Sequence, residues 1–227
     1  MRFRSAVAVL ATVGVLFAPL SAAAAAPASR LLAAPGDVLA MPLNDALGAL
    51  IVEEEDRTGY KRTLFRHWVD ADRDGCDSRA EVLKQEAVVA PVQGAGCKLS
   101  GGRWYSAYDD KYVDGPSGLD IDHLVPLAEA WDSGASRWSP AERQEYANDL
   151  SVERSLIAVS ARTNRSKADQ DPATWMPPAE GYRCQYVADW IATKLRWQLT
   201  IDSAEKTALS EKATGCPNLP VRVALAR

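Results

Sequence analysis

The sequence contains few of the residues on which common metalloenzyme and hydrolase sites depend. Of its 227 residues, two are histidine and four are cysteine. The cysteines lack the closely spaced pairs of a structural zinc site, and no His-Glu-x-x-His segment of a zinc peptidase occurs. A nucleophile elbow of the serine-hydrolase type is also missing. These absences disfavour catalysis that depends on zinc or on a serine nucleophile.

Positive charge is scarce as well. The formal net charge is −4, and without Arg2 and Arg4 it becomes −6. Proteins that read DNA sequence tightly are usually basic, so this class is disfavoured. Binding of a polyanion would have to rest on a metal together with a local group of cations. Arg162, Arg165 and Lys167 form such a group and are the candidate substrate-binding residues.

Long apolar runs are confined to the amino-terminal end. A basic start is followed by apolar residues 6–20 and by small residues 21–26, which is the pattern of a secretory signal peptide over 1–26. We therefore expect a secreted, extracellular and monomeric protein that does not enter the membrane after signal removal. Residues 27–42 are rich in Pro and Ala and predict a flexible leader, and 43–227 has the length of one domain.

Secretion predicts that the four cysteines form disulfides, because an oxidising compartment favours these bonds. Four cysteines allow three pairings. Cys76–Cys97 and Cys184–Cys216 are favoured, since each closes a local loop on one side of the segment from Asp122 to Asn164.

Local patterns indicate an α+β fold. Ser139, Pro140 and Glu142 have the types and spacing of an N-cap, a first helical residue and a capping box, which predicts a helix through Tyr146. Gly101-Gly102 between strand-like flanks predicts a hairpin. Four further helices are expected: one over 43–67 broken near Gly59, one over 78–89, one over 182–199 and one capped by Asp202. A strand over 156–160 is expected to lead into a helix from 161. The strands cluster between about 97 and 160.

The segment Asp120-Ile-Asp-His123 joins a carboxylate pair to one of the two histidines. Alternating apolar residues predict a strand that ends near His123. A neutral imidazole beside carboxylates can act as a general base. Asp122 and the amide oxygen of Asn164 would suit a hard cation with several waters, which favours Mg²⁺ or Mn²⁺. Together they point to metal-assisted phosphodiester hydrolysis.

This ordered set resembles the HNH endonucleases of the His-Me finger, or ββα-metal, group. The matching segments are Asp120-Ile-Asp-His-Leu-Val-Pro126, Asn148-Asp-Leu150, Leu156-Ile-Ala-Val-Ser160 and Asn164-Arg-Ser-Lys167, with Asp171-Pro-Ala-Thr-Trp175 as in small secreted bacterial members. The resemblance covers 120 to about 178. It implies a ββα-metal core (about 119–178) with a β-hairpin, flanked by N- and C-terminal helices.

The resemblance also implies roles for single residues. Asp122 and Asn164 would bind the metal, His123 would be the general base, and Asn148 would fix the loop that orients the base. The sequence lacks the zinc-binding Cys pairs of many members, so disulfides and flanking helices would have to brace the core. The implied activity is cleavage of DNA, with RNA as a further substrate, at low sequence specificity.

A second acidic segment fits a twelve-residue calcium loop. Asp70, Asp72, Asp74 and Glu81 stand at ligand positions and Gly75 at the turn, which would give a structural Ca²⁺ site. Asp77 occupies a position that is normally apolar in such loops, so an acidic turn capping the next helix is the simpler interpretation. Two alternative functions remain open from sequence: a non-catalytic calcium-binding module, and a metallophosphodiesterase acting on small substrates.

Overall fold

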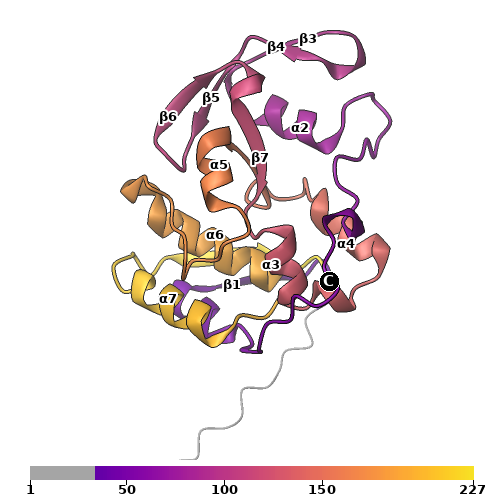
Figure 1. Cartoon of the computed structure of the whole chain (residues 1–227). Helices are drawn as coiled ribbons and strands as arrows, with labels where there is room; N and C mark the ends of the chain where they lie inside the picture. The colour runs from indigo at the N-terminus through magenta and orange to yellow at the C-terminus, as the bar shows by residue number, and fades with distance from the viewer. Residues whose placement is uncertain (1–33) are drawn as a thin grey trace, which may run out of the picture. The chain divides into compact units, whose positions relative to one another are not determined.

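The computed structural model describes residues 34–227. The expected signal peptide and residues 27–33 of the expected leader lie outside these residues. No helix in the described range is both long enough and apolar enough to cross a membrane. The range contains seven α-helices: α1 (Leu43–Ala49), α2 (Ser78–Gln85), α3 (Leu127–Asp132), α4 (Pro140–Ala147), α5 (Ala161–Lys167), α6 (Arg183–Arg196) and α7 (Ser203–Ala213) (Figure 1).

Nine short strands form four small sheets within the described range. They are β1 (Val38–Pro42), β2 (Ala87–Val89), β3 (Val92–Gln93), β4 (Leu99–Ser100), β5 (Arg103–Ser106), β6 (Lys111–Asp114), β7 (Leu119–His123), β8 (Leu156–Ser160) and β9 (Pro220–Ala224). The sheets pair β1 with β9, β2 with β5 and β6, β3 with β4, and β7 with β8. The fold is therefore mixed, with helices and small antiparallel sheets, as the α+β expectation proposed in outline.

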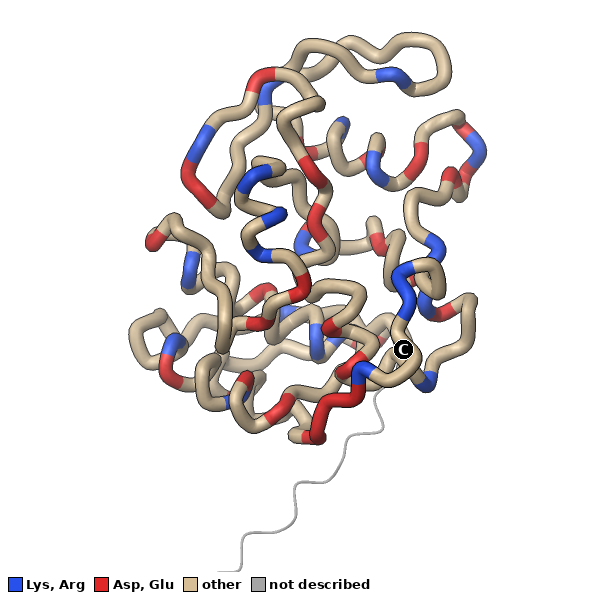
Figure 2. Tube along the Cα trace, in the orientation of Figure 1, with Lys and Arg blue, Asp and Glu red and all other residues tan. Residues whose placement is uncertain are grey.

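The antiparallel pair β7–β8 leads directly into α5. Its register runs from Leu119 opposite Ser160 to His123 opposite Leu156. Leu119 and Ile121 face a small core with Leu156, Ala158, Val82, Leu83 and Trp104. Because side chains alternate along a strand, Asp120 and Asp122 project to the other face, where α5 supplies their partners. Figure 2 shows the acidic positions of β7 beside the basic positions of α5.

A larger core lies below this unit in Figure 1, around α6. Tyr186, Trp190 and Ile191 of α6 are fully buried there, with Leu209 of α7. Strand β1 pairs along its whole length with β9. The expectation of a flexible leader is thus wrong for Val38–Pro42, which forms a strand because it pairs with a strand at the far end of the chain.

Two local expectations were wrong. The helix expected over 43–67 ends at Ala49, and Leu50 is already extended. Four consecutive acidic residues follow at 53–56, and like charges at helical spacing oppose a helix. Gly101 and Gly102 do not turn one hairpin, since β4 pairs with β3 and β5 pairs with β2 and β6. The hairpin is β5–β6, one step further along the chain.

Other local expectations were confirmed. Helix α4 begins with the full capping box: Ser139 accepts from the backbone N–H of Glu142, and Glu142 accepts from that of Ser139. Asp202 caps α7 by accepting from the N–H of Glu205 at 2.6 Å. The expected helix over 78–89 is shorter, because α2 ends at Gln85 and β2 follows.

Both favoured disulfides are present. Cys76–Cys97 and Cys184–Cys216 have Cα–Cα distances of 5.1 and 5.4 Å. Each closes a loop of moderate length, for which loop entropy alone stabilises the fold by about 3 kcal/mol. The first ties the segment before α2 to the turn before β4, and the second ties α6 to the end of α7.

Candidate active site

A cavity of about 320 Å³ opens where β7 ends beside α5. Its polar lining is Asp122 and His123 from β7, Asn164 and Arg165 from α5, Asp169 just after α5, and Arg62. Three residues that the sequence assigned to one site, Asp122, His123 and Asn164, therefore share one cavity. A larger hollow of about 720 Å³ lies elsewhere, beside Tyr105 and Tyr182, but no histidine lines it.

Asp122 is buried and tightly held. Its Oδ2 accepts hydrogen bonds from the Tyr108 hydroxyl at 2.6 Å and from the Lys167 ammonium at 2.7 Å. Burial raises the pKa of Asp122, while the charge of Lys167 acts in the opposite direction. Its second oxygen, Oδ1, has no hydrogen-bond partner within residues 34–227. One carboxylate oxygen is thus left available to the cavity.

His123 has a defined tautomer. Its Nε2 lies 2.9 Å from the carbonyl oxygen of Ala147. Because a carbonyl can only accept, Nε2 carries the hydrogen and Nδ1 keeps its lone pair. Burial lowers the pKa of His123 to about 3, so the ring is neutral over the ordinary pH range. Trp68 and Tyr146 flank the ring, with centroids at 5.5 and 6.4 Å.

Asn164 is oriented by Asp120. Its Nδ2 lies 3.4 Å from Asp120 Oδ2, the same oxygen that Arg165 Nε approaches at 3.4 Å. With its N–H group directed at a carboxylate, the amide oxygen of Asn164 is free to face the cavity. The first carboxylate of the Asp120-Ile-Asp-His123 segment therefore orients α5 side chains, and the second one lines the cavity.

Asn148 does not line the cavity. Its Oδ1 accepts from the N–H of Val69 at 2.9 Å and from Ser78 Oγ at 2.7 Å. Its Nδ2 donates to the carbonyls of Arg66 and Gln144, each at 2.7 Å. The side chain thus fastens the segment that carries Trp68 next to Ala147, the hydrogen-bond partner of His123. That Asn148 thereby fixes the loop that orients His123, as the resemblance implied, stays a prediction.

The three cations expected to bind substrate lie in different surroundings. Arg165 lines the cavity and its side chain is 75% exposed. Arg162 is exposed and lines a neighbouring cavity with Lys111. Lys167 is fully buried, so the expectation that it contacts substrate is not supported. Its ammonium instead holds Asp122 and the carbonyl of His123, at 2.7 and 3.2 Å.

Sequence reasoning missed several participants. Tyr108 lies outside the motif; it is fully buried, and its hydroxyl donates to Asp122. Arg62 and Asp169 line the cavity, although neither belongs to the motif. Trp68 contacts His123 from a backbone with φ of 60°, which is unusual for a bulky residue and is often found at functional sites. No local pattern marks these residues, because their positions arise from tertiary contacts.

The calcium-loop residues are only partly brought together. Carboxylate oxygens of Asp70, Asp72 and Asp74 lie within 4.8 Å of one another. Glu81 forms a second close group with Asp74 and Cys76, but its carboxylate accepts from Lys84 at 2.8 Å, and the same ammonium lies 3.9 Å from Asp74. Asp77 caps α2 by accepting from the N–H of Ala80 at 2.9 Å. The helix-capping interpretation is thus confirmed, and calcium binding stays a prediction.

The cavity is not a dense cluster of metal ligands. Asp122 belongs to no group of three or more closely spaced Asp, Glu, His or Cys ligands in the described part of the chain. The donors available are one carboxylate oxygen of Asp122 and the amide oxygen of Asn164, with the Asp169 carboxylate in the same lining. Few hard oxygen donors and room for water suit Mg²⁺ or Mn²⁺. The residues present therefore fit such a cation.

Comparison with known proteins gives two findings. Residues 80–212 match the family described as the C-terminal domain of GmrSD restriction endonucleases. An uncharacterized secreted protein of the fungus Arthroderma benhamiae is 37% identical over 212 residues, covering 93% of this chain and 96% of the relative. That relative is fungal, so it does not support the expected bacterial grouping. No solved structure matches this chain.

Proposed function

Because the chain belongs to the family of the C-terminal domain of GmrSD restriction endonucleases, we propose that it is a secreted, metal-dependent endonuclease. Its substrate would be DNA, with RNA as a further substrate, cleaved with little sequence specificity. The family supports a nuclease, and the secreted relative supports export. The HNH type and the metal are our own extension, supported by the motif and by the cavity.

One observation carries the proposal: Asp122, His123 and Asn164 line a single cavity, and the unprotonated Nδ1 is the free nitrogen of the imidazole. In hydrolysis, a water oxygen attacks phosphorus opposite the 3′ oxygen. The phosphorus–3′-oxygen bond breaks and the departing 3′ oxygen takes a proton from solvent, leaving a 5′-phosphate and a 3′-hydroxyl. His123 Nδ1 takes the proton of the attacking water.

Asp122 Oδ1 and Asn164 Oδ1 would hold the divalent cation, which supplies charge stabilisation for the departing oxygen when bound. Lys167 and Tyr108 occupy Asp122 Oδ2 and so limit Asp122 to one metal–oxygen contact. Asp120 orients the Asn164 amide. Arg165 and the exposed Arg162 would attract the flanking phosphates.

A buried base with a low pKa needs help to accept a proton. Burial is the main cause of the low pKa of His123, and the positive charges of Arg62 and Lys167 add to it. A phosphate in the cavity would offset these charges and favour the imidazolium that forms during attack. The base is thereby expected to become effective mainly when substrate is bound.

The test is cleavage of supercoiled plasmid and of RNA by the mature protein with Mg²⁺, Mn²⁺, Ca²⁺ or chelator. We expect nicking with Mg²⁺ or Mn²⁺, loss of nicking in chelator, and products that a ligase accepts, since ligases require 5′-phosphates. Cleavage that persists in chelator would overturn the metal role. Failure to cut either polymer with every metal would overturn the nuclease proposal.

A further inference from the structure

Arg62 reaches the cavity from a part of the chain that the motif does not include. It begins the short 3-10 helix η1 (Arg62–Leu64), 60 positions before Asp122. Nevertheless it lines the same cavity as Asp122, His123 and Asn164. A cation from outside the motif thus stands beside the proposed reacting groups.

The segment that carries Arg62 is anchored on both sides. Phe65 is fully buried and packs against Trp131 and Tyr146, with ring centroids at 6.4 and 6.1 Å. Tyr60 packs edge-on against Trp131 at 6.1 Å. Arg143, in turn, donates from Nε to the carbonyl of Leu64 at 3.3 Å. These contacts fix the backbone, so the position of Arg62 is not that of a loose surface loop.

Arg62 differs from the other arginines near the cavity in its charge partners. Arg165 lies 3.4 Å from Asp120, while Arg57 pairs with Asp132 at 2.5 Å and approaches Asp169 at 3.9 Å. Within residues 34–227, Arg62 forms no ion pair with a carboxylate. Its guanidinium is therefore not committed to a carboxylate, and the neighbour with which it interacts is the neutral hydroxyl of Tyr60, so its positive charge is uncompensated toward an anionic ligand.

The cavity needs such a cation if it is to accept a phosphate. Asp122 and Asp169 place two carboxyl groups in the lining. Lys167 compensates Asp122 but is buried, so it presents no donor to solvent. A planar guanidinium, by contrast, can bind two phosphate oxygens at once.

Resting on the proposed nuclease function, we propose that Arg62 binds the non-bridging oxygens of the scissile phosphate. Negative charge on these oxygens grows as water attacks. The contact with Arg62 therefore strengthens in the transition state and should act chiefly on kcat. Arg165 and Arg162 lie on the exposed side of α5 and would serve flanking phosphates instead.

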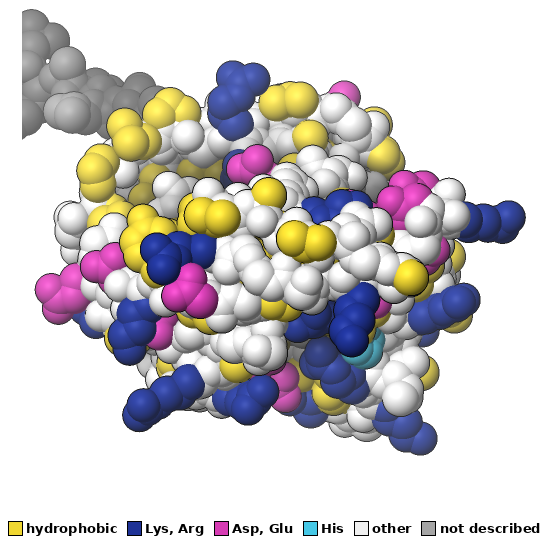
Figure 3. Space-filling view, turned by 90° about the horizontal axis from the view of Figure 1, so that it is seen from above, with side chains coloured by type: hydrophobic (Ala, Val, Ile, Leu, Met, Phe, Trp, Pro, Cys, Tyr) yellow, Lys and Arg dark blue, Asp and Glu magenta, His cyan; other side chains and the backbone are white. Residues whose placement is uncertain are grey.

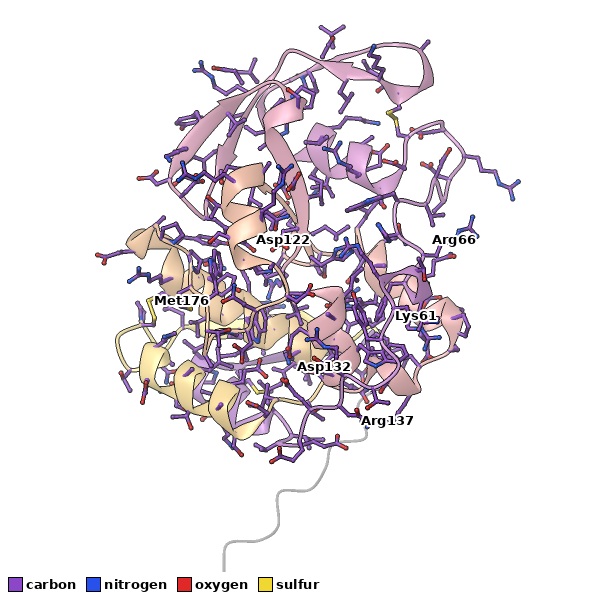
Figure 4. All side chains as sticks on the ribbon, in the orientation of Figure 1. Lys61, Arg66, Asp122, Asp132, Arg137 and Met176 are labelled. Carbon is purple, nitrogen blue, oxygen red and sulfur yellow. A yellow bond between two sulfur atoms is a disulfide. The ribbon has the colours of Figure 1, made fainter. Side chains whose placement is uncertain are left out.

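Arg66 provides a matched control. It is an exposed arginine on the same segment, and it is not part of the cavity lining. In Figure 4 its side chain lies at the edge of the molecule, away from Asp122. Substitution of Arg66 leaves its backbone carbonyl, which accepts from Asn148, in place. A general loss of surface charge would affect both variants alike.

The experiment compares the wild type with Arg62→Ala, Arg62→Lys, Arg62→Gln and Arg66→Ala. Steady-state cleavage of a duplex oligonucleotide gives kcat and KM, and a small diester, bis(4-nitrophenyl) phosphate, tests the reaction without flanking phosphates. We expect Arg62→Ala to lower kcat about 100-fold, with KM changed only a few-fold. Arg62→Lys should retain part of the activity, and Arg66→Ala should keep the wild-type kcat on both substrates.

The outcomes separate the two proposals. An active wild type whose Arg62→Ala and Arg62→Gln variants keep the wild-type kcat would overturn the role of Arg62 alone. Equal losses in the Arg62→Ala and Arg66→Ala variants would also overturn it, because they would indicate surface charge. A wild type that cleaves neither substrate would overturn the nuclease function and this role together. If Arg62→Ala fails to fold, as judged by circular dichroism, the Lys and Gln variants decide.

Discussion

The Nε2 atom of His123 lies 2.9 Å from the carbonyl oxygen of Ala147, at the end of α4. This contact assigns the hydrogen to Nε2 and leaves Nδ1 as the basic atom. It also makes the orientation of the proposed base depend on where α4 ends. The residue after Ala147 is Asn148, whose four hydrogen bonds fasten that end to the segment carrying Trp68.

Replacing Asn148 with Ala should therefore lower kcat. The imidazole would lose the fixed position of its carbonyl acceptor and of Trp68, and small misplacements of a catalytic group cost up to about 100-fold in rate. KM should change little, since Asn148 does not line the cavity. Asn44→Ala, at an exposed position of α1, is the control. A folded Asn148→Ala variant with wild-type kcat would contradict the positioning role.

Replacing Asn164 with Ala should weaken binding of the metal more than binding of DNA. The variant loses an oxygen donor, so the Mg²⁺ concentration for half-maximal activity should rise at least about tenfold. Tenfold is about the smallest loss of metal affinity expected when a residue that supports a metal site is replaced. Affinity for an oligonucleotide, measured by fluorescence anisotropy in chelator, should stay within about twofold, since that binding rests chiefly on cations at the surface. Asn164→Asp, which keeps an oxygen, should retain metal-dependent cleavage.

Ser166→Ala on the same helix is the control for Asn164, because Ser166 lies outside the cavity. Should Asn164→Ala show an unchanged Mg²⁺ requirement, the amide is not a metal ligand.

Seen from above, several Lys and Arg side chains gather around the visible edge of a histidine (Figure 3), so local positive charge exists on this face despite the acidic net charge.

Replacing Lys167 with Met should destabilise the fold strongly. The ammonium is fully buried and compensates Asp122 at 2.7 Å, and removing it leaves a buried carboxylate without its partner. Such a loss costs about 3–5 kcal/mol. Urea denaturation followed by circular dichroism measures it, with the exposed Lys61→Met as control. The double variant with Asp122→Asn should recover part of the lost free energy of unfolding. A Lys167→Met protein that is as stable as the wild type would contradict the stabilising role of the ion pair.

Replacing Glu86 with Gln should change how stability depends on pH. Burial raises the pKa of Glu86 to about 7, although its carboxylate accepts from the N–H of Ala158 in β8 at 2.8 Å. The folded protein thus holds this proton more tightly than the unfolded chain, whose pKa is near 4.5. The contribution of Glu86 to the free energy of unfolding is therefore most favourable below pH 4.5, and this stabilisation is lost as the pH rises toward 7.

The Glu86→Gln variant should accordingly gain free energy of unfolding relative to wild type between pH 4.5 and 8, as measured by urea denaturation at several pH values. Gln can still accept from the N–H of Ala158. The exposed Glu211→Gln is the control and should follow wild type throughout. A constant difference between Glu86→Gln and wild type across this pH range would contradict the raised pKa.

Short-range patterns predicted those parts of the fold that local interactions decide. The capping box of α4, the cap of α7, the strand before Ser160 and the helix after it were all visible in the sequence. The pairing of β1 with β9 was not, since it joins residues more than 170 positions apart. The same limit applies to the site: Asp122, His123 and Asn164 follow from a motif, whereas Arg62 reaches the cavity only through the packing of Phe65.

The buried state of Lys167 illustrates why charge in a sequence does not identify a substrate contact. Within α5, Arg162, Arg165 and Lys167 look equivalent, but helical periodicity directs Lys167 inward, toward Asp122. Thr163, four positions earlier, is also buried, and the two arginines are exposed. Only knowledge of which face packs on β7 would have separated them.

Replacement of His123 with Ala is the most direct test of the proposed chemistry. His67→Ala is its matched control, because the His67 ring lies only 6.4 Å from His123 but outside the cavity lining, with Nδ1 against the carbonyl of Phe65. In Mg²⁺, plasmid nicking by His123→Ala should fall by about 10³-fold, with the circular dichroism spectrum and oligonucleotide affinity retained, while His67→Ala stays within a few-fold of wild type. A folded His123→Ala protein that nicks plasmid at the wild-type rate would contradict the assignment of the base.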